Sequence, residues 1–473
     1  MTTAIIIYIC INIFAIFNIM LYGARPAKSL SWILIVLILP FIGALLYLVF
    51  GINRRRFKFF TLKQTTKRKL YDINHQQQRS KNTDIEFKSK AEKKLATLVG
   101  NSSKFYATDG NDVEVLNDGE NTFDTIFEEL EKAEKFIHLQ YYIFEEGEIL
   151  DKFYDLFSKK VEQGVEVRII YDAIGSFSWK KKSINKFKDL GVQVFPTMPL
   201  HYGSFLFTLN YRNHRKIIVI DGKVGFTGGV NVTDKYIKPI SPLGIWDDIH
   251  VRLKGPAVDS LHRVFIKDYF FASNNELLLK DKYLPESEKA GDKMIQIVSS
   301  GPDSNHPAIM QQYIEMINLA EDYIYISNPY FIPNSAMLEA IRIAALSDVK
   351  IKLLVPSKLD SWLAKYSMFS YFQELLFVGV EIYLQNDNFL HSKLIIMDGK
   401  ISSIGSGNFD HRSFEHNFET NALIFDESIT DQLCTDFING CDTCEKLEFE
   451  KYKNRPLKRK LMEGMARFFS PLL

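Results

Sequence analysis

Two long apolar runs open the chain. Neither residues 4–22 nor residues 29–52 include a charged side chain. As a helix, each run is long enough to cross about 30 Å of hydrocarbon. Only residues 23–28 lie between them. The pattern predicts a two-helix transmembrane hairpin over residues 1–53, and a helical hairpin buried in a protein core is the alternative.

Basic residues follow the second apolar run at once. Eight lysines and arginines precede the first acidic residue after the hairpin: Arg54, Arg55, Arg56, Lys58, Lys63, Lys67, Arg68 and Lys69. Because lysine and arginine concentrate in cytoplasmic loops, we expect a multi-pass protein of the cell membrane whose remaining domains are cytoplasmic. The same side chains would attract anionic membrane lipids. Residues 54–104 have little apolar periodicity and are interpreted as a basic juxtamembrane linker.

Helical and extended patterns alternate from residue 105 onwards. Apolar residues recur at i, i+3, i+4 and i+7 from Phe123, as on one face of a helix. Strands are predicted over residues 136–144, 165–171, 192–195, 323–331 and 349–355. Strands separated by helices favour an α/β fold. We therefore expect two similar domains, residues 105–290 and 291–473, each a mixed, mostly parallel sheet with helices on both faces.

One polar motif is repeated in these two halves. His214, Lys216, Asp221 and Asn231 recur 177 positions later as His391, Lys393, Asp398 and Asn408. Earlier features repeat at longer intervals, which implies about eleven extra residues before the first motif. This insertion includes Leu200, His201, Tyr202, Phe205, Leu206 and Phe207, which could line an acyl-chain entrance, reach the membrane interface or pack as an ordinary loop. The repeat predicts one active site shared by two halves.

The repeated residue types suit phosphate chemistry. On a strand, positions two apart face the same way, so His214 projects with Lys216, and His391 with Lys393. Lysine ammonium and asparagine amide groups, here including Asn231 and Asn408, can bind phosphate oxygens and the charge of the transition state. Ser406, which stands where the first half has Gly229, could assist them. Within this candidate catalytic set, Asp221 and Asp398 fit a turn-holding role better than substrate contact.

Two histidines can divide the labour of phosphoryl transfer. One attacks phosphorus, and the other protonates the leaving oxygen and later deprotonates the acceptor. Each imidazole then needs a partner on its second nitrogen. Asp248, 34 positions after His214, and Glu419, 28 after His391, are the candidates, with Asp247 as the competing choice.

Composition narrows the function further. The chain has 473 residues, and its 58 lysines and arginines nearly balance 57 acidic residues, so it lacks the positive charge of most nucleic-acid-binding proteins. Four cysteines are too few for a disulfide scaffold. Cys441 and Cys444 could form a redox or metal pair, but free structural thiols are the simpler interpretation. The basic and apolar residues 457–469 could lie on lipid or pack against the second domain.

These motifs resemble the phospholipase D superfamily, and the chain as a whole resembles its bacterial cardiolipin synthases. The likeness rests on the doubled His-x-Lys-x-x-x-x-Asp motif, the N-terminal hairpin, and the segments 246–250, 328–331 and 469–473. It implies one site without metal or cofactor, at which a phosphatidyl group passes between two phosphatidylglycerol molecules and glycerol is released. His214 would be the nucleophile and His391 the general acid and base.

Other functions stay open from the sequence. A hydrolytic phospholipase D, or a phosphatidyltransferase with another alcohol acceptor, would use the same residues. A nuclease is disfavoured by the hairpin and the balanced charge, and a non-catalytic membrane scaffold is disfavoured by two intact motifs. The sequence contains no indication of an oligomeric state or of acyl-chain preference.

Overall fold

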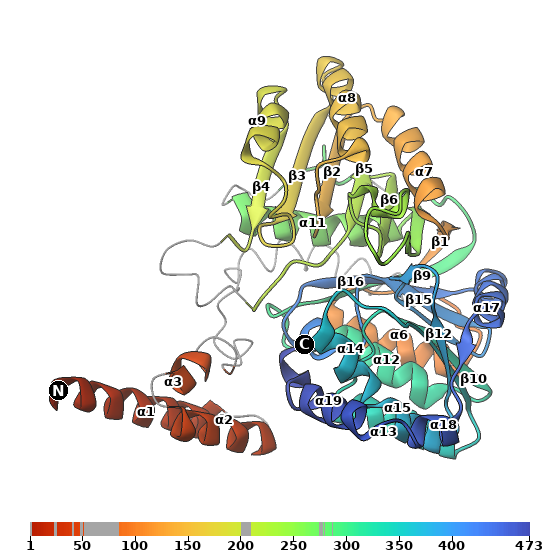
Figure 1. The fold of residues 1–473 in the computed structure, drawn as a ribbon. Helices are drawn as coiled ribbons and strands as arrows, with labels where there is room; N and C mark the ends of the chain where they lie inside the picture. Colours follow the sequence, from red (N-terminus) through yellow and green to blue (C-terminus); the bar gives the residue numbers. More distant parts are fainter. Residues whose placement is uncertain are drawn as a thin grey trace.

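The computed structural model describes residues 2–22, 26–39, 42–47, 51, 85–199, 210–273, 278, 280–285 and 287–473. The basic residues 54–69 and the aromatic insertion residues 200–207, both singled out in the sequence, lie outside these ranges. Figure 1 shows two lobes, with the first half of the chain above the second.

The first lobe alternates strands and helices as expected. Its strands are β1 (Thr108–Leu116), β2 (Phe136–Tyr141), β3 (Glu166–Asp172), β4 (Gln193–Thr197), β5 (Ile217–Ile220), β6 (Val224–Gly228), β7 (Trp246–Asp247) and β8 (His250–Lys254). Its helices are α7 (Gly119–Glu131), α8 (Glu148–Glu162), α9 (Lys181–Asp189), η3 (Asp234–Tyr236) and α11 (Ala257–Ser273). Side chains of α7, α8 and α9 form one core with the sheet. The helix α11 covers the opposite face, between the lobes in Figure 1.

The second lobe repeats this plan. Its strands are β9 (Lys293–Ser300), β10 (Tyr323–Ser327), β11 (Lys350–Pro356), β12 (Glu381–Gln385), β13 (Phe389–Leu390), β14 (Leu394–Met397), β15 (Ile401–Gly405), β16 (Glu419–Phe425) and β17 (Glu445–Lys446). Its helices are α12 (Ala308–Leu319), α13 (Ser335–Leu346), α14 (Trp362–Phe369), α15 (Phe372–Phe377), α16 (His411–Glu415), α17 (Glu427–Asp442), α18 (Phe449–Lys453), α19 (Leu457–Phe468) and η4 (Ser470–Leu472). The helix α17 takes the place that α11 has in the first lobe.

The two half-sheets join edge to edge through antiparallel pairing of β1 with β9. The strand order β4-β3-β2-β5-β6-β8-β1 in one half matches β12-β11-β10-β14-β15-β16-β9 in the other. Within this large sheet, the described strands pair in parallel only in β2–β3–β4 and β10–β11–β12. The expectation of mostly parallel sheets is therefore wrong. Each motif strand turns back within three residues, at Asp221 or Asp398, and so short a turn can only join antiparallel neighbours.

A helix precedes the first lobe and packs on the second. The helix α6 (Lys90–Ser103) lies inside the segment interpreted as a linker, and its N-cap Ser89 accepts a hydrogen bond from the amide of Glu92 (3.1 Å). Leu95 and Val99 are fully buried in the core of the second lobe. The chain therefore crosses to the second lobe before it builds the first.

The N-terminal helices α1 (Thr2–Tyr22), α2 (Pro26–Ile38) and α3 (Ile42–Leu46) pack on one another. Ala15, Ile19, Trp32 and Val36 are buried between them, while most other apolar side chains described here are exposed. No helix of the described residues combines the length and apolar character needed to cross a membrane. The two-span hairpin stays a prediction.

Candidate active site

Two short backbone ladders bring the repeated motifs together. Before β5, the amide of His214 donates to the carbonyl of Phe418 (2.9 Å), and Phe418 donates back to Arg212 (2.9 Å). In the second ladder β13 pairs with β7, and the amide of His391 donates to the carbonyl of Asp247 (2.7 Å). Each histidine of one half therefore lies against the acid-bearing segment of the other half.

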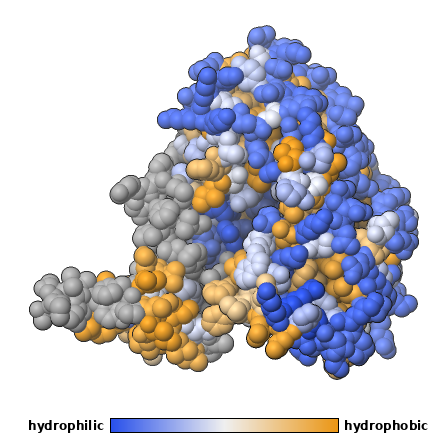
Figure 2. Space-filling view, in the orientation of Figure 1, coloured by the Kyte–Doolittle hydropathy of each residue, from blue (hydrophilic) through white to orange (hydrophobic). Residues whose placement is uncertain are grey.

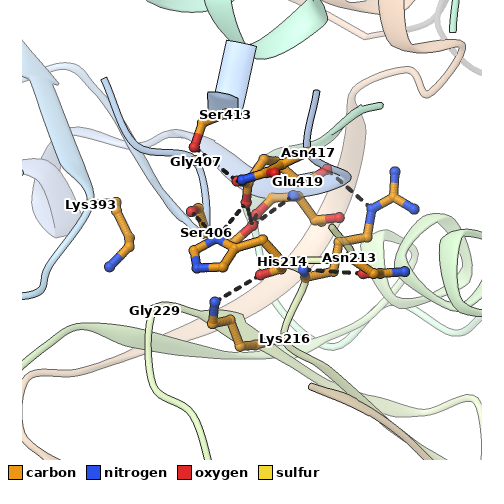
Figure 3. A network of polar contacts seen from close by, with 12 residues as sticks. Asn213, His214, Lys216, Gly229, Lys393, Ser406, Gly407, Ser413, Asn417 and Glu419 are labelled. Atoms are coloured by element: carbon orange, nitrogen blue, oxygen red, sulfur yellow. Dashed lines mark hydrogen bonds and ion pairs between the residues drawn. The ribbon is translucent and has the colours of Figure 1, made fainter. Parts of the chain in front are cut away.

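The imidazole of His214 is fixed by Glu419. Its Nδ1 lies 3.0 Å from Oε2 of Glu419, whose carboxylate also accepts hydrogen bonds from Ser406, Ser413 and Asn417 (Figure 3). Burial alone would raise the pKa of this carboxyl, but the neighbouring His214 and the hydrogen bonds lower it. An ionised carboxylate holds a proton on Nδ1 and leaves the lone pair on Nε2 for chemistry.

His391 has the equivalent arrangement with Asp248. Its Nδ1 lies 2.5 Å from Oδ2 of Asp248, and the hydroxyl of Tyr236 lies 3.3 Å from each of these two atoms. Asp247, the competing choice, accepts a hydrogen bond from Gln385 instead (3.2 Å). Counted along the sequence, each acid follows the histidine of its own half. In space, each acid orients the histidine of the opposite half.

Two lysines lie fully buried beside the imidazoles. Nζ of Lys216 donates to the carbonyl of His214 (2.8 Å), and Nζ of Lys393 donates to the carbonyl of His391 and lies 3.0 Å from its Nδ1. Figure 3 shows both amines beside the His214 ring. Burial, with the charge of Lys393, lowers the pKa of Lys216 to about 7, and burial lowers the pKa of Lys393 to about 8. Burial also lowers the pKa of both histidines. An anion bound here would stabilise the protonated lysines, so the site favours an anionic ligand.

The two motif aspartates hold turns. Asp221 accepts hydrogen bonds from the amides of Glu134, Lys135 and Phe136, and Asp398 accepts them from Glu321, Asp322 and Tyr323. Both have left-handed backbone angles, with φ of 53° and 51°. Asp221 and Asp398 thus clamp the loops before β2 and β10. Both residues were predicted as part of the catalytic set, and the structure gives them a structural role instead.

The two motif asparagines differ in their contacts. Oδ1 of Asn231 accepts from the amide of Ile143 (3.2 Å), and its amide donates to Tyr236 (3.4 Å). Asn408 is 5% exposed, and its Oδ1 has no hydrogen-bond partner among the described residues. Ser406 donates its hydroxyl to Glu419, so the expectation that it assists with phosphate is wrong. Both asparagines lie in the buried part of the site.

Tyr236 and Ser413 are site residues that motif matching does not find. They are separated by the same 177 positions as the histidines, and each hydroxyl donates to the carboxylate that orients a histidine. The signal in the sequence is a shared hydroxyl group at equivalent positions rather than a shared residue type. Asn417, which donates to Glu419 (3.2 Å), has no such signal.

Gly229 leaves room for the carboxylate of Asp248. A Cβ added at Gly229 would lie 1.9 Å from Oδ1 of Asp248, a distance that requires the carboxylate to move. Glu419 is longer by one methylene, and its half has Ser406 at the equivalent position. We expect Gly229→Ala to lower kcat by about 100-fold or more, because misplacing a catalytic partner by about 1 Å has that effect.

The control for this prediction is Gly440→Ala on α17, since a Cβ at Gly440 would meet only the Leu354 side chain, at an ordinary contact distance of 3.8 Å. Turnover of phosphatidylglycerol by both variants, at matched thermal stability, provides the measurement. Equal rates for Gly229→Ala and the wild type would show that the Asp248 contact does not orient His391.

The remaining candidate residues lie apart from this chemistry. The four cysteines are free, with Cys441 buried and Cys444 half-buried. Among the described residues, no group of three or more histidine, cysteine or acidic side chains is arranged to hold a metal ion.

Comparison with known proteins agrees with this geometry. The family described as "Cardiolipin synthase, PLD-like domain" matches residues 126–248 and 313–440, and a "Phospholipase_D-nuclease N-terminal" family matches residues 10–51. A cardiolipin synthase of a Geobacillus species is 37% identical over 98% of this chain and 92% of its own length. One from Oceanobacillus iheyensis is 37% identical over 97% of this chain and 96% of its own length.

A solved structure shares the fold. Phosphatidylserine synthase of Haemophilus influenzae superposes with a TM-score of 0.60 at 15% identity, over 80% of this chain and 99% of that one. The doubled motif, the paired lobes and the full-length similarity lead to one assignment: the chain belongs to the cardiolipin synthase family of the phospholipase D superfamily.

Proposed function

We propose that the site transfers a phosphatidyl group from one phosphatidylglycerol molecule to another, giving cardiolipin and glycerol through a phosphohistidine intermediate. The observation that carries the proposal is the crossed pair of buried contacts, His214 with Glu419 and His391 with Asp248, beside two buried lysines. Membership of the cardiolipin synthase family supports the substrate and the product.

The two histidines take different parts in this proposal. Nε2 of His214 attacks phosphorus, and the bond from phosphorus to the glycerol oxygen breaks while His391 gives that oxygen a proton. The terminal hydroxyl of a second phosphatidylglycerol then attacks phosphorus and passes its proton to His391. The phosphorus–nitrogen bond breaks, and His214 is free again.

The lysines and asparagines stabilise the charge that this reaction moves. Lys216 and Lys393 neutralise the nonbridging phosphate oxygens, and the amides of Asn231 and Asn408 donate to them. The bound phosphate anion in turn raises the pKa of His391, which lets that imidazole carry the proton that the leaving glycerol needs. Substrate binding thereby prepares the general acid.

The lowered lysine pKa values predict how activity depends on pH. Since kcat/KM reports groups of the free enzyme, we expect it to fall as pH rises through about 7 to 8, where Lys216 and Lys393 lose their protons. Ordinary lysines would keep these protons to about pH 10. The decline should approach tenfold per pH unit when one lysine titrates. A profile of kcat/KM in mixed micelles that stays flat to pH 10 would contradict this assignment.

The remaining segments fit a membrane enzyme. In this proposal residues 1–53 anchor the chain in the cell membrane, residues 54–104 approach anionic lipid, and the domains 105–290 and 291–473 face the cytoplasm. The exposed apolar side chains of α1 and α2 and the match of an N-terminal family to residues 10–51 support the anchor.

Product analysis tests the proposed function. Purified full-length protein given phosphatidylglycerol should form cardiolipin and glycerol in equal amounts, as thin-layer chromatography and glycerol release would show. Phosphatidic acid without cardiolipin would instead identify a hydrolytic phospholipase D. A phosphatidyl ester of an added alcohol, formed in place of cardiolipin and with release of glycerol, would identify a different acceptor.

A further inference from the structure

The helix α19 is built with its apolar side outward. Four large apolar side chains are exposed along one stripe: Leu457 at 72%, Leu461 at 60%, Met465 at 63% and Phe468 at 69%. Their spacing of three or four residues places them on one face of the helix. Gly464 lies on that face too, and a Cβ there would have no atom within 4 Å. No residue in the described part of the chain therefore covers this stripe.

The inner side of α19 is polar. Glu463 is 1% exposed, and its carboxylate accepts hydrogen bonds from Arg455 (2.7 Å), Arg459 (3.0 Å) and Tyr452 (3.2 Å). Only Ala466 adds a buried apolar side chain from this helix. Helices on the surface of soluble proteins bury the apolar face and expose the charged one. The orientation of α19 is the reverse, and its ion pairs fix it.

We infer that the outer face of α19, formed by Leu457, Leu461, Met465 and Phe468, docks on the surface of a bilayer that contains anionic lipid. Lys458 and Lys460 are exposed on the two flanks of the apolar stripe, where headgroup phosphates would lie if the stripe entered the acyl-chain boundary. A second protein copy or a segment of the same chain would need apolar contacts but not this pair of lysines. The two flanking lysines therefore favour an anionic lipid surface over a protein partner.

The docking face is connected to the active site. The helix α19 leads into η4, and directly after η4 the carbonyl of Leu473 accepts a hydrogen bond from the amide of Arg412 (2.9 Å) near the start of α16. From α16, Ser413 donates to Glu419, the acid beside His214. Figures 1 and 2 place apolar surface on the lower lobe near the C-terminus. Docking would hold this side of the site at the plane of its lipid substrate.

The contacts of α19 separate the two alternatives given for residues 457–469, because its large apolar side chains are exposed rather than packed against the second lobe. The inference rests on the proposed function only in that the substrate is a membrane lipid. A test that reads docking without turnover keeps the two separable.

The test uses the full-length protein in nanodiscs and a thiol placed on the stripe. Met465→Cys is compared with Lys159→Cys, an exposed position on α8 in the first lobe. A polar maleimide modifies the thiols, and peptide mass spectrometry measures the rate at each position. We expect modification at position 465 to be about tenfold slower in discs with phosphatidylglycerol than in discs of phosphatidylcholine alone, with no change at position 159.

A charge-reversed variant separates lipid from other partners. Each lysine at an anionic surface strengthens binding by about fivefold, so adding Lys458→Glu and Lys460→Glu should weaken docking by about 30-fold or more and restore rapid modification at position 465. Equal rates in both lipids would overturn the inference. So would protection that follows protein concentration, which indicates a second copy, or protection in both lipids that the charge reversal leaves intact. Protection at position 465 in a protein that forms no cardiolipin would contradict the proposed function but still support docking.

Discussion

His391→Ala should lose cardiolipin synthesis while keeping the ability to form a phosphoenzyme from an activated substrate. General acid catalysis contributes about 10²- to 10⁴-fold, so turnover of phosphatidylglycerol is expected to fall by at least that factor. A phosphatidyl ester of p-nitrophenol has a leaving group that departs without a proton. With this substrate, His214 can still attack, and a burst of nitrophenolate with a trapped phosphohistidine should appear.

His214→Ala is the matched variant for this experiment. It lacks the proposed nucleophile, so neither the burst nor the phosphohistidine should form, whatever the leaving group. Because Glu419 and Asp248 bind the two histidines in equivalent ways, each alanine variant leaves one buried acid without its partner. The two variants therefore disturb the buried site to a similar extent, and a difference between them reflects the roles of the histidines. A burst in His214→Ala and none in His391→Ala would exchange the two roles.

The repeat in the sequence predicted the pairs of catalytic candidates more fully than their contacts. The constant interval of 177 positions is enough to place His214 and His391, with their lysines, in equivalent places of two similar halves. Spacing along a chain cannot indicate that an acid faces the opposite half. That crossing depends on the two backbone ladders, which join residues 143 and 205 positions apart.

The sequence correctly predicted which segments form helices and strands, because local pattern determines them. It predicted the strand directions wrongly, because these depend on the length of the turns. The alternation of helix and strand predicted an α/β chain with β2, β3, β10 and β11 close to the expected ranges. The parallel expectation did not allow for the tight turns after the motif strands, which force antiparallel pairing in the middle of each half. Nor did it predict that α6 would pack on the second lobe, because its apolar residues are few and their partners lie about 200 positions away.

Arg215→Met is expected to lower the free energy of unfolding by about 3–5 kcal/mol, because it leaves the buried carboxylate of Asp268 without its cationic partner. Arg215 precedes β5, and its contacts with α11 and β9 place its guanidinium in the interior between the lobes. It is fully buried, and both oxygens of Asp268 lie within hydrogen-bond distance of Nη1 (2.7 and 2.6 Å). The sequence alone does not distinguish it from an exposed arginine.

The same guanidinium joins the two halves beside the site. It donates to Ser299 (2.7 Å) and to the carbonyl of Ser300 (3.0 Å) on β9, and its Nε donates to the carbonyl of Glu419 (3.2 Å). Losing it should therefore shift Glu419 relative to His214. We expect turnover to fall together with stability, and denaturant unfolding of the full-length protein in detergent measures the second effect.

Two further variants decide whether burial or charge pairing causes the loss. Arg252→Met removes a partly exposed arginine that pairs with Glu114 and Glu129, and it should cost no more than about 1 kcal/mol. Adding Asp268→Asn to Arg215→Met removes the uncompensated buried charge, and the amide oxygen can still accept a hydrogen bond from Gln140 or Asn213. The double variant should therefore recover most of the lost stability but not the turnover, since the hydrogen bond to the carbonyl of Glu419 is still missing. A double variant as unstable as Arg215→Met would show that Arg215 stabilises the protein through β9 and Glu419 rather than through Asp268.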